Sequence, residues 1–120
     1  MSTTNWKLYV EDNVLVADFA EGMPSDAEEY QRVNERFERL AGRNEVDAHM
    51  SVLNMSASLN GDVFQKAQEA AEVGTEYGIT KWAIVSDGIK SLALKGKVEE
   101  MGVETMTSDD EAEALDWARN

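Results

Sequence analysis

The sequence contains no cysteine and only one histidine, His49, among its 120 residues. A disulfide framework and a thiolate metal site are therefore excluded, and a transition-metal site would depend almost entirely on carboxylates. Neither a GxGxxG nor a GxxxxGK[ST] pattern occurs, so the common glycine-rich phosphate loops are absent. No apolar run approaches the ~18 residues of a membrane span, and Met1–Val10 lacks a secretory signal pattern. We therefore expect a cytoplasmic protein without a cofactor or a metal.

Basic residues are also scarce. Lysine and arginine number 11 against 24 aspartates and glutamates, and the net charge is −13. Such a protein repels nucleic-acid phosphates and anionic membrane surfaces, so we expect neither a nucleic-acid partner nor membrane insertion. Hydrophobic residues still make up 42% of the chain, which favours a folded core over disorder. At ionic strengths near 1 M the Debye length is only about 3 Å, which screens acidic self-repulsion. The acidity indicates adaptation to high salt, with an ordinary acidic mesophilic protein as the alternative.

The stretch Ile79–Leu94, ITKWAIVSDGIKSLAL, organises the predicted fold. Its first part, Ile79–Val85, is apolar enough for an interior strand that is buried on both faces of a sheet. Ser86-Asp87-Gly88 then breaks the strand, and a helix follows with Ile89, Leu92 and Ala93 as its periodic apolar positions. A strand, a polar turn and a helix start make half of a βαβ unit. In open α/β sheets, ligands and partners usually dock at this carboxyl end of the strands.

The rest of the chain extends this pattern to a single domain over residues 1–120. We predict an α/β fold with the order β-β-α-β-α-β-α-β-α and a five-stranded mixed sheet. The first two strands form a hairpin, because Asp12-Asn13 tolerates a tight turn. Expected core residues are Trp82 or Ala83, Ile84, Val85, Phe19, Phe37, Val52 and Leu53. The other predicted strands are Trp6–Val10, Val14–Phe19, Val46–Met55 and Val103–Thr107. The helix after the second strand begins at a capping box of Ser25 and Glu28 and ends at Gly42. The helix after the third strand runs from its N-cap Asn60 to Gly78, and the last helix begins at a capping box of Ser108 and Glu111.

Few residues could carry chemistry. His49 lies in mid-strand, where a solvated or core-edge position explains it better than a catalytic one. No nucleophile and base can be paired from residues that the sequence brings together, so we predict no catalytic residue and no enzymatic activity. The chain has one locally basic stretch, and it surrounds the turn at Asp87. Asp87, Lys90, Lys95 and Lys97 form a possible docking patch, unless these lysines are ordinary surface residues.

The second half of the chain resembles a known family. The segments KWAIVSDGIKSLALKGKVE and GVETMTSDDEAEALDWAR are similar to the SpoIIAA-like branch of the STAS fold family, and the acidity resembles that of a haloarchaeal member. The resemblance implies helices packed on a mixed sheet, and a role in regulation or binding rather than catalysis. STAS regulators carry a phosphorylatable serine in a D-S-[ST]-G motif after the third strand. Here that place reads NMSASLNG, in which serines are present but the aspartate is not.

The resemblance therefore makes Ser56, Ser58 and Asn60 a candidate interaction or phosphorylation loop. A phosphate beside a helix N-terminus would be electrostatically favourable. In the alternative, Ser58 and Asn60 only cap the helix. We predict a salt-adapted regulatory or protein-interaction module with a protein partner. The other function left open is binding of a small apolar or amphipathic ligand between sheet and helices, because the branch overlaps in shape with Sec14-like lipid-binding domains.

Overall fold

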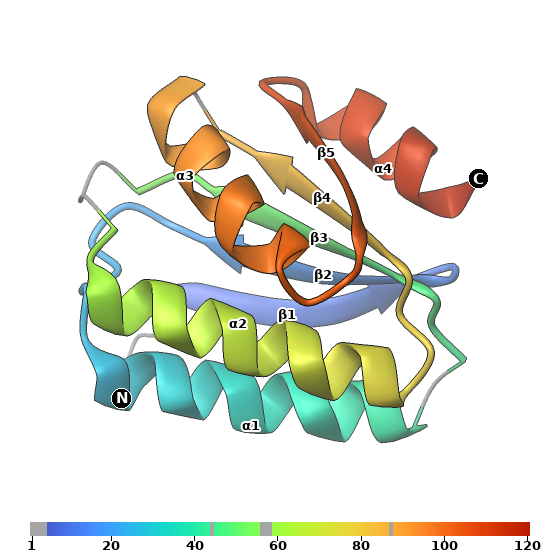
Figure 1. The fold of residues 1–120 in the computed structure, drawn as a ribbon, viewed down its shortest axis with the longest axis horizontal. Coiled ribbons are helices and arrows are strands. Elements are labelled where there is room, and N and C mark those ends of the chain that lie inside the picture. The colour runs from blue at the N-terminus through green and yellow to red at the C-terminus, as the bar shows by residue number, and fades with distance from the viewer. Residues whose placement is uncertain (1–4, 44, 56–58, 87) are drawn as a thin grey trace.

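The computed structural model describes residues 5–43, 45–55, 59–86 and 88–120. These residues form one five-stranded sheet and four helices, in the order that the sequence predicts. Figure 1 shows how these elements are arranged. The elements are β1 (Trp6–Glu11), β2 (Val14–Phe19), α1 (Ala27–Arg43), β3 (Ala48–Leu53), α2 (Gly61–Glu76), β4 (Lys81–Val85), α3 (Gly88–Glu99), β5 (Glu104–Ser108) and α4 (Glu111–Arg119).

The predicted hairpin is confirmed. Strands β1 and β2 pair antiparallel, and Glu11 opposite Val14 leaves Asp12 and Asn13 as a two-residue turn. Asp12 has φ = 55°, a left-handed conformation that aspartate tolerates better than most residues. The other pairs, β2 with β3, β3 with β4 and β4 with β5, are parallel, so the sheet is mixed.

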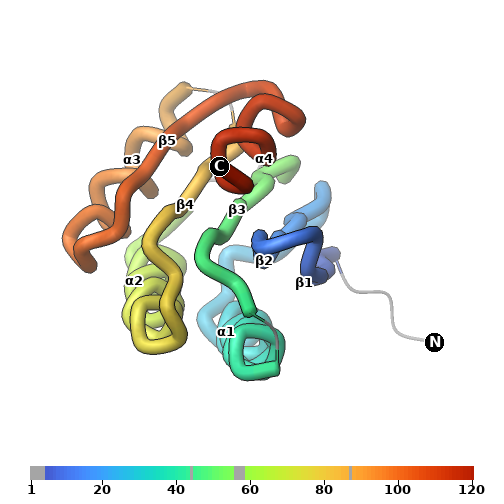
Figure 2. The backbone as a smooth tube through the Cα atoms, turned by 90° about the vertical axis from the view of Figure 1, so that its right-hand side faces the viewer, coloured from blue at the N-terminus to red at the C-terminus, as the bar shows by residue number. Residues whose placement is uncertain are grey.

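The sheet order β1-β2-β3-β4-β5 follows the chain order without reversal. Right-handed crossovers that always step in the same direction place their helices on the same face of the sheet. Accordingly α1, α2 and α3 lie on one face, and α4 covers the other (Figure 2). Ligand crevices of doubly wound sheets form where the strand order reverses. The described strands have no such reversal, so their carboxyl ends do not form that kind of crevice.

The core has two layers, one on each face of the sheet. Trp82 and Ile84 of β4 point toward α1–α3, whereas Ala83 and Val85 point toward α4. The burial of β4 on both faces confirms the prediction for Ile79–Val85. The predicted core is also confirmed, since these residues are all at most 8% exposed: Phe19, Phe37, Val52, Leu53, Trp82, Ala83, Ile84 and Val85.

Helix ends were predicted less well than helices. The N-cap of α4 is Asp110, whose carboxylate accepts from Ala112 N at 2.9 Å, and not the predicted Ser108. Ser108 ends β5 instead, where its carbonyl accepts from Ser86 N at 3.0 Å. At α1, Asp26 Oδ1 accepts from Glu28 N at 3.0 Å, in place of the predicted capping box at Ser25. The helix also continues through the predicted stop at Gly42 to Arg43.

Candidate functional site

The predicted interaction loop is described only at its end. Ser56 and Ser58 lie outside the described residues. Asn60 is the N-cap of α2, as the sequence predicts, and its Oδ1 accepts from Val63 N at 3.0 Å. Its amide Nδ2 donates to the Ser25 carbonyl at 3.0 Å, which joins the start of α2 to the segment before α1. Asn60 therefore has a structural role at this end of the helical layer.

The lysines of the predicted docking patch all come from α3, and Asp87 lies outside the described residues. Lys90 Nζ donates to the Met55 carbonyl and so ties α3 to the segment after β3. Lys95 Nζ lies 3.5 Å from the Glu99 carboxylate. Lys97 is exposed, and its backbone carbonyl accepts from Gln68 Nε2 of α2 at 3.2 Å. The structure thus distributes the three lysines along one helix, with different partners, and does not gather them into one cluster.

Helix α3 buries a different face from the one that its sequence pattern indicates. Ser91, Leu94 and Val98 point into the protein, and Ser91 Oγ donates to the Gly88 carbonyl at 3.0 Å. The predicted periodic residues point outward, and Ile89 is 88% exposed and Leu92 65% exposed. The apolar periodicity of Ile89, Leu92 and Ala93 therefore does not mark the buried face of the helix. Among the described ranges, no helix is both long and apolar enough to cross a membrane.

We call the outward residues Ile89, Leu92, Ala93 and Gly96 the α3 stripe. Their positions i, i+3, i+4 and i+7 fall on one side of a helix with 3.6 residues per turn. An open groove borders the stripe between α3 and the end of β5, and Leu92, Ser91 and Thr107 line part of it. The stripe therefore lies beside the carboxyl end of the sheet, where the sequence predicts docking.

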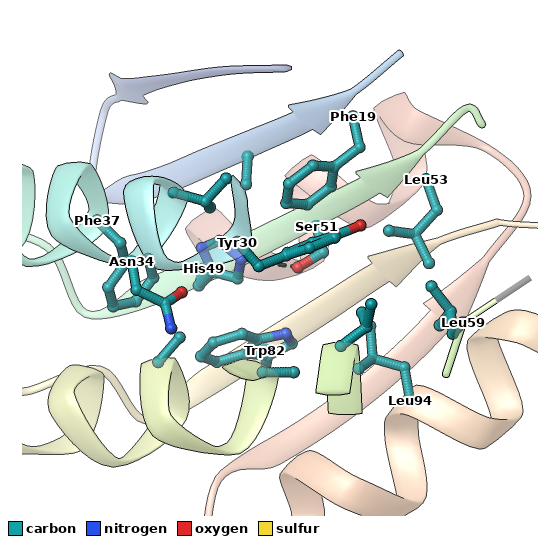
Figure 3. Close-up of a pocket in the computed structure, with 15 residues that line it drawn as sticks. Phe19, Tyr30, Asn34, Phe37, His49, Ser51, Leu53, Leu59, Trp82 and Leu94 are labelled. Carbon is teal, nitrogen blue, oxygen red and sulfur yellow. Dashed lines mark hydrogen bonds between the residues drawn. The ribbon is translucent and has the colours of Figure 1, made fainter. Parts of the chain in front are cut away.

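An interior cavity of about 40 Å³ lies between the sheet and the helices on its α1–α3 face (Figure 3). Most of its lining is apolar, for example Phe37 of α1 and Leu94 of α3. His49 and Ser51 of β3 and Trp82 of β4 contribute polar atoms. His49 Nε2 and Ser51 Oγ are 2.8 Å apart and hydrogen bonded. In contrast, His49 Nδ1 and Trp82 Nε1 have no hydrogen-bond partner of good geometry among the described residues.

His49 is a core residue, and the predicted solvated or core-edge position is wrong. It is 2% exposed, and its ring centroid lies 4.2 Å from that of Trp82 and 5.1 Å from that of Phe37. Burial lowers the pKa of His49 to about 3, while the backbone of Leu15, its neighbour on β2, opposes the shift slightly. The imidazole is therefore neutral at physiological pH. Residues of α1 and α2 line the pocket beside His49 and Ser51 and cover this face of β3.

The described residues offer little for catalysis. No group of three His, Asp or Glu side chains in these ranges could hold a metal ion. The only histidine packs against the rings of Phe37 and Trp82 and is hydrogen bonded to the Ser51 hydroxyl. In the described ranges it makes no hydrogen bond to a carboxylate that would orient it as a base. Sequence reasoning missed two features, the exposure of the α3 stripe and the polar cluster of His49, Ser51 and Trp82. The pairing of β3 with β4 could have indicated the second, because it places His49 beside Trp82.

Comparisons with known proteins bear on the fold. No family model matches the sequence, and no curated protein matches it. A solved structure from Shewanella loihica matches over 98% of each chain, with a TM-score of 0.61 and 17% sequence identity. That protein is an uncharacterized member of the DUF3478 family with a SpoIIAA-like fold. This chain therefore has a SpoIIAA-like fold. The match confirms the predicted fold, and at this identity the likeness is one of fold alone.

Proposed function

We propose that this SpoIIAA-like chain is a non-catalytic regulatory module that binds another protein through the α3 stripe. The observation that carries the proposal is the exposure of Ile89 and Leu92, 88% and 65%, on one side of one helix. Large apolar side chains that cluster at a surface mark interaction sites, whereas isolated ones need no explanation. A regulatory role is what the resemblance to STAS domains implies. The burial of His49 among rings, with a serine hydroxyl as its hydrogen-bond partner, further favours binding over catalysis.

The test replaces the stripe and keeps the fold. Tagged wild-type protein and an Ile89→Ser/Leu92→Ser variant are used to capture partners from a native lysate. A captured protein is then identified, purified and titrated against both forms by calorimetry. Tyr77→Ser is the matched control, because Tyr77 is another exposed large apolar residue, 43% exposed, at the end of α2. We expect binding by wild type and control and loss in the double variant. Equal affinities for all three forms would refute the proposal.

A second candidate function, binding of a small amphipathic ligand, is favoured by the cavity. Among the described residues, Trp82 Nε1 has no hydrogen-bond partner and His49 Nδ1 has none of good geometry. A buried polar atom without a partner costs about 1–3 kcal/mol unless a ligand bonds to it. The volume of about 40 Å³ holds about three waters, since one water needs roughly 10–15 Å³ on this scale. Drug-sized ligands occupy pockets of roughly 300–1,000 Å³. An amphipathic ligand would therefore require the helices to move away from the sheet.

Native mass spectrometry of protein purified without denaturant distinguishes the two candidates. A bound organic mass that is lost in Trp82→Phe, which removes only the indole N–H and some ring volume, supports the ligand. If only the mass of the protein without ligand is found, and partner binding requires the α3 stripe, the protein-interaction module is supported and the ligand is not. Both results are obtained from the same preparation, so the two candidates are compared under one condition.

We also propose that the module is adapted to high salt. Among the described residues, only Arg32, Lys66, Lys95 and Arg119 form ion pairs with carboxylates. Apart from Glu21, most of the acidic residues in the described ranges consequently have no ion pair to neutralise their charge. Mobile cations are then the means of reducing their mutual repulsion. The dependence of stability on KCl, predicted below, tests this part of the proposal.

A further inference from the structure

We infer that the partner of the α3 stripe presents an acidic amphipathic helix. This inference rests on the proposed function, because it names the chemistry of the partner at the same surface. It depends on two further observations. One is the spacing and size of the residues in the stripe, and the other is the charge of the surface beside them.

The spacing of the stripe suits a helix as its partner. Side chains at i, i+3, i+4 and i+7 form the ridge that packs into the groove of a second helix. Ile89 and Leu92 supply bulk at the first half of α3, while Ala93 and Gly96 are small. No atom lies within 4 Å of the position that a Cβ on Gly96 would occupy, so this point of the surface is open. Small residues there allow a partner helix to approach at the short end of the usual interaxial range of about 8–10 Å.

The charge beside the stripe is opposite to that of the whole protein. Helix α3 contains three lysines and one acidic residue, Glu99, in a chain with a net charge of −13. At 100° per residue, Lys90 and Lys97 lie on one side of the stripe and Lys95 lies on the other. On the Lys95 side, the Glu99 carboxylate lies 3.5 Å from the lysine Nζ and offsets its charge. A partner helix with an apolar ridge and glutamates or aspartates beside it would therefore meet positive charge on the side of Lys90 and Lys97. Complementary charge at the rim of an interface chiefly sets partner choice and association rate.

The same charges disfavour a second copy of this chain as the occupant. In a symmetric antiparallel pair of α3 helices, each side of the stripe meets the same side of the other copy. Lys90 of one copy would then lie near Lys97 of the other, twice in the interface. Like charges placed opposite each other oppose association. Two chains of net charge −13 also repel each other at moderate salt.

The test uses two synthetic helical peptides that share one apolar ridge of leucine and alanine at i, i+3, i+4 and i+7. The acidic peptide has glutamates beside the ridge, and the basic peptide has lysines. Binding is measured by fluorescence anisotropy at 0.15 M and 1 M NaCl, and the contact surface is mapped by amide chemical shifts. We expect the acidic peptide to bind wild type on α3, about tenfold more tightly than the basic one at 0.15 M NaCl. The difference should shrink at 1 M, where the Debye length is about 3 Å.

Charge reversal supplies the decisive comparison. Lys95→Glu/Lys97→Glu should invert the preference, so that the basic peptide binds more tightly. Lys7→Glu/Lys66→Glu makes the same change in net charge on β1 and α2 and should leave the preference unchanged. Circular dichroism checks that both variants are folded. If the reversal leaves the preference unchanged, or if neither peptide binds wild type, the inference is wrong.

Failure of the inference can be distinguished from failure of the proposed function. If a natural partner requires Ile89 and Leu92 but still binds the charge-reversed variant, the proposed function stands and the inference of an acidic helix is wrong. A partner that tolerates Ile89→Ser/Leu92→Ser overturns both. If analytical ultracentrifugation shows that the wild type is a dimer and that Leu92→Ser is a monomer, the stripe is a self-association surface. Stripe-dependent binding to vesicles of phosphatidylcholine and phosphatidylglycerol would assign it to a membrane. Either of these last two results also overturns the inference.

Discussion

The sharpest prediction concerns the response of stability to pH, because the sequence has one histidine and the structure buries it. His49 has an ordinary pKa of about 6.5 in the unfolded chain and a pKa of about 3 in the folded protein. The unfolded state therefore binds the proton first as the pH falls. Stability from this residue is fully present above about pH 6.5 and is lost as the pH falls toward 3. Each pH unit within that window removes about 1.4 kcal/mol.

Between pH 7 and pH 5 the loss from His49 should amount to about 2 kcal/mol, because only the upper part of the window is crossed. The assay is urea unfolding at several pH values across that range, in constant KCl. His49→Gln is measured in parallel, since glutamine can still donate to Ser51 Oγ but does not titrate. Protonation of surface carboxylates relieves repulsion and acts in the opposite direction in both proteins. The difference between the two proteins therefore isolates the imidazole.

We expect wild type to lose about 2 kcal/mol relative to His49→Gln between pH 7 and pH 5. An equal pH dependence in the two proteins would show that His49 is solvated or that it has a charged partner. A relative gain for wild type at pH 5 would mean that folding favours the imidazolium. Either result would refute the placement of His49 in the core. The variant may be less stable at every pH without affecting the test, because only the change with pH is compared.

Three further predictions follow from particular residues. Ile84→Ala should destabilise by ~2–5 kcal/mol in thermal or urea unfolding, because Ile84 is 0% exposed in the middle of the sheet; a cost below ~1 kcal/mol would contradict its placement. Asn60→Ala should cost about 1 kcal/mol through loss of the α2 cap, with Asn60→Asp as a conservative control that retains it. The midpoint of unfolding should rise as KCl increases from ~0.1 to ~2 M, most steeply at first, and a flat or falling midpoint would remove the salt adaptation.

The loop serines remain a prediction, and their test differs from that of α3. Ser56→Asp and Ser58→Asp add negative charge beside the Asn60 cap of α2. If the loop is a charge switch, they should change retention of a partner while the far-ultraviolet circular dichroism stays constant. If Ser58 only caps the helix, Ser58→Ala should lower the free energy of unfolding by ~1 kcal/mol and leave the retention of partners unchanged. Unchanged retention in both aspartate variants would end the switch hypothesis.

The fold could be predicted because its signals are local and agree with one another. Asp12-Asn13 specifies the hairpin, Asn60 and Gly78 delimit α2, and the apolar run before Ser86 specifies an interior strand. The predictions of helix caps failed where a residue had two possible roles. Ser108 is a good N-cap by type, but the parallel pairing of β5 with β4 holds it in the sheet, opposite Val85. Asp110 then serves as the cap, and the strand pairing that decides this is not visible in the sequence.

The exposed α3 stripe was not predicted, and the predicted site residues Ser56 and Ser58 stay a prediction. The carboxyl end of the sheet and the lysines of α3 were identified from the sequence. The contact of Lys90 with the Met55 carbonyl was not, because it joins segments 35 residues apart in the sequence. The pairing of Lys95 with Glu99 was missed, although i,i+4 spacing on a helix could have indicated it. The environment of His49 could not be predicted either. An alternating strand looks half-solvated until the helices on each side of the sheet are placed, and only then is the imidazole known to be enclosed.

Helix α3 shows most clearly why sequence periodicity left the site open. Ile89 and Leu92 on one side, and Leu94 and Val98 on the other, give two apolar faces, with the lysines between them. Periodicity alone does not tell which of two such faces packs on the sheet. The fold covers only one of them. Burial of Ile89 and Leu92 by a partner would contribute about 1.5–3 kcal/mol for each side chain to the free energy of binding, which is the scale of an interface hot spot. Both side chains are largely exposed in the free protein, so their replacement by serine costs little folding free energy. Folding and binding are therefore separable at this face, which makes the α3 stripe testable by substitution.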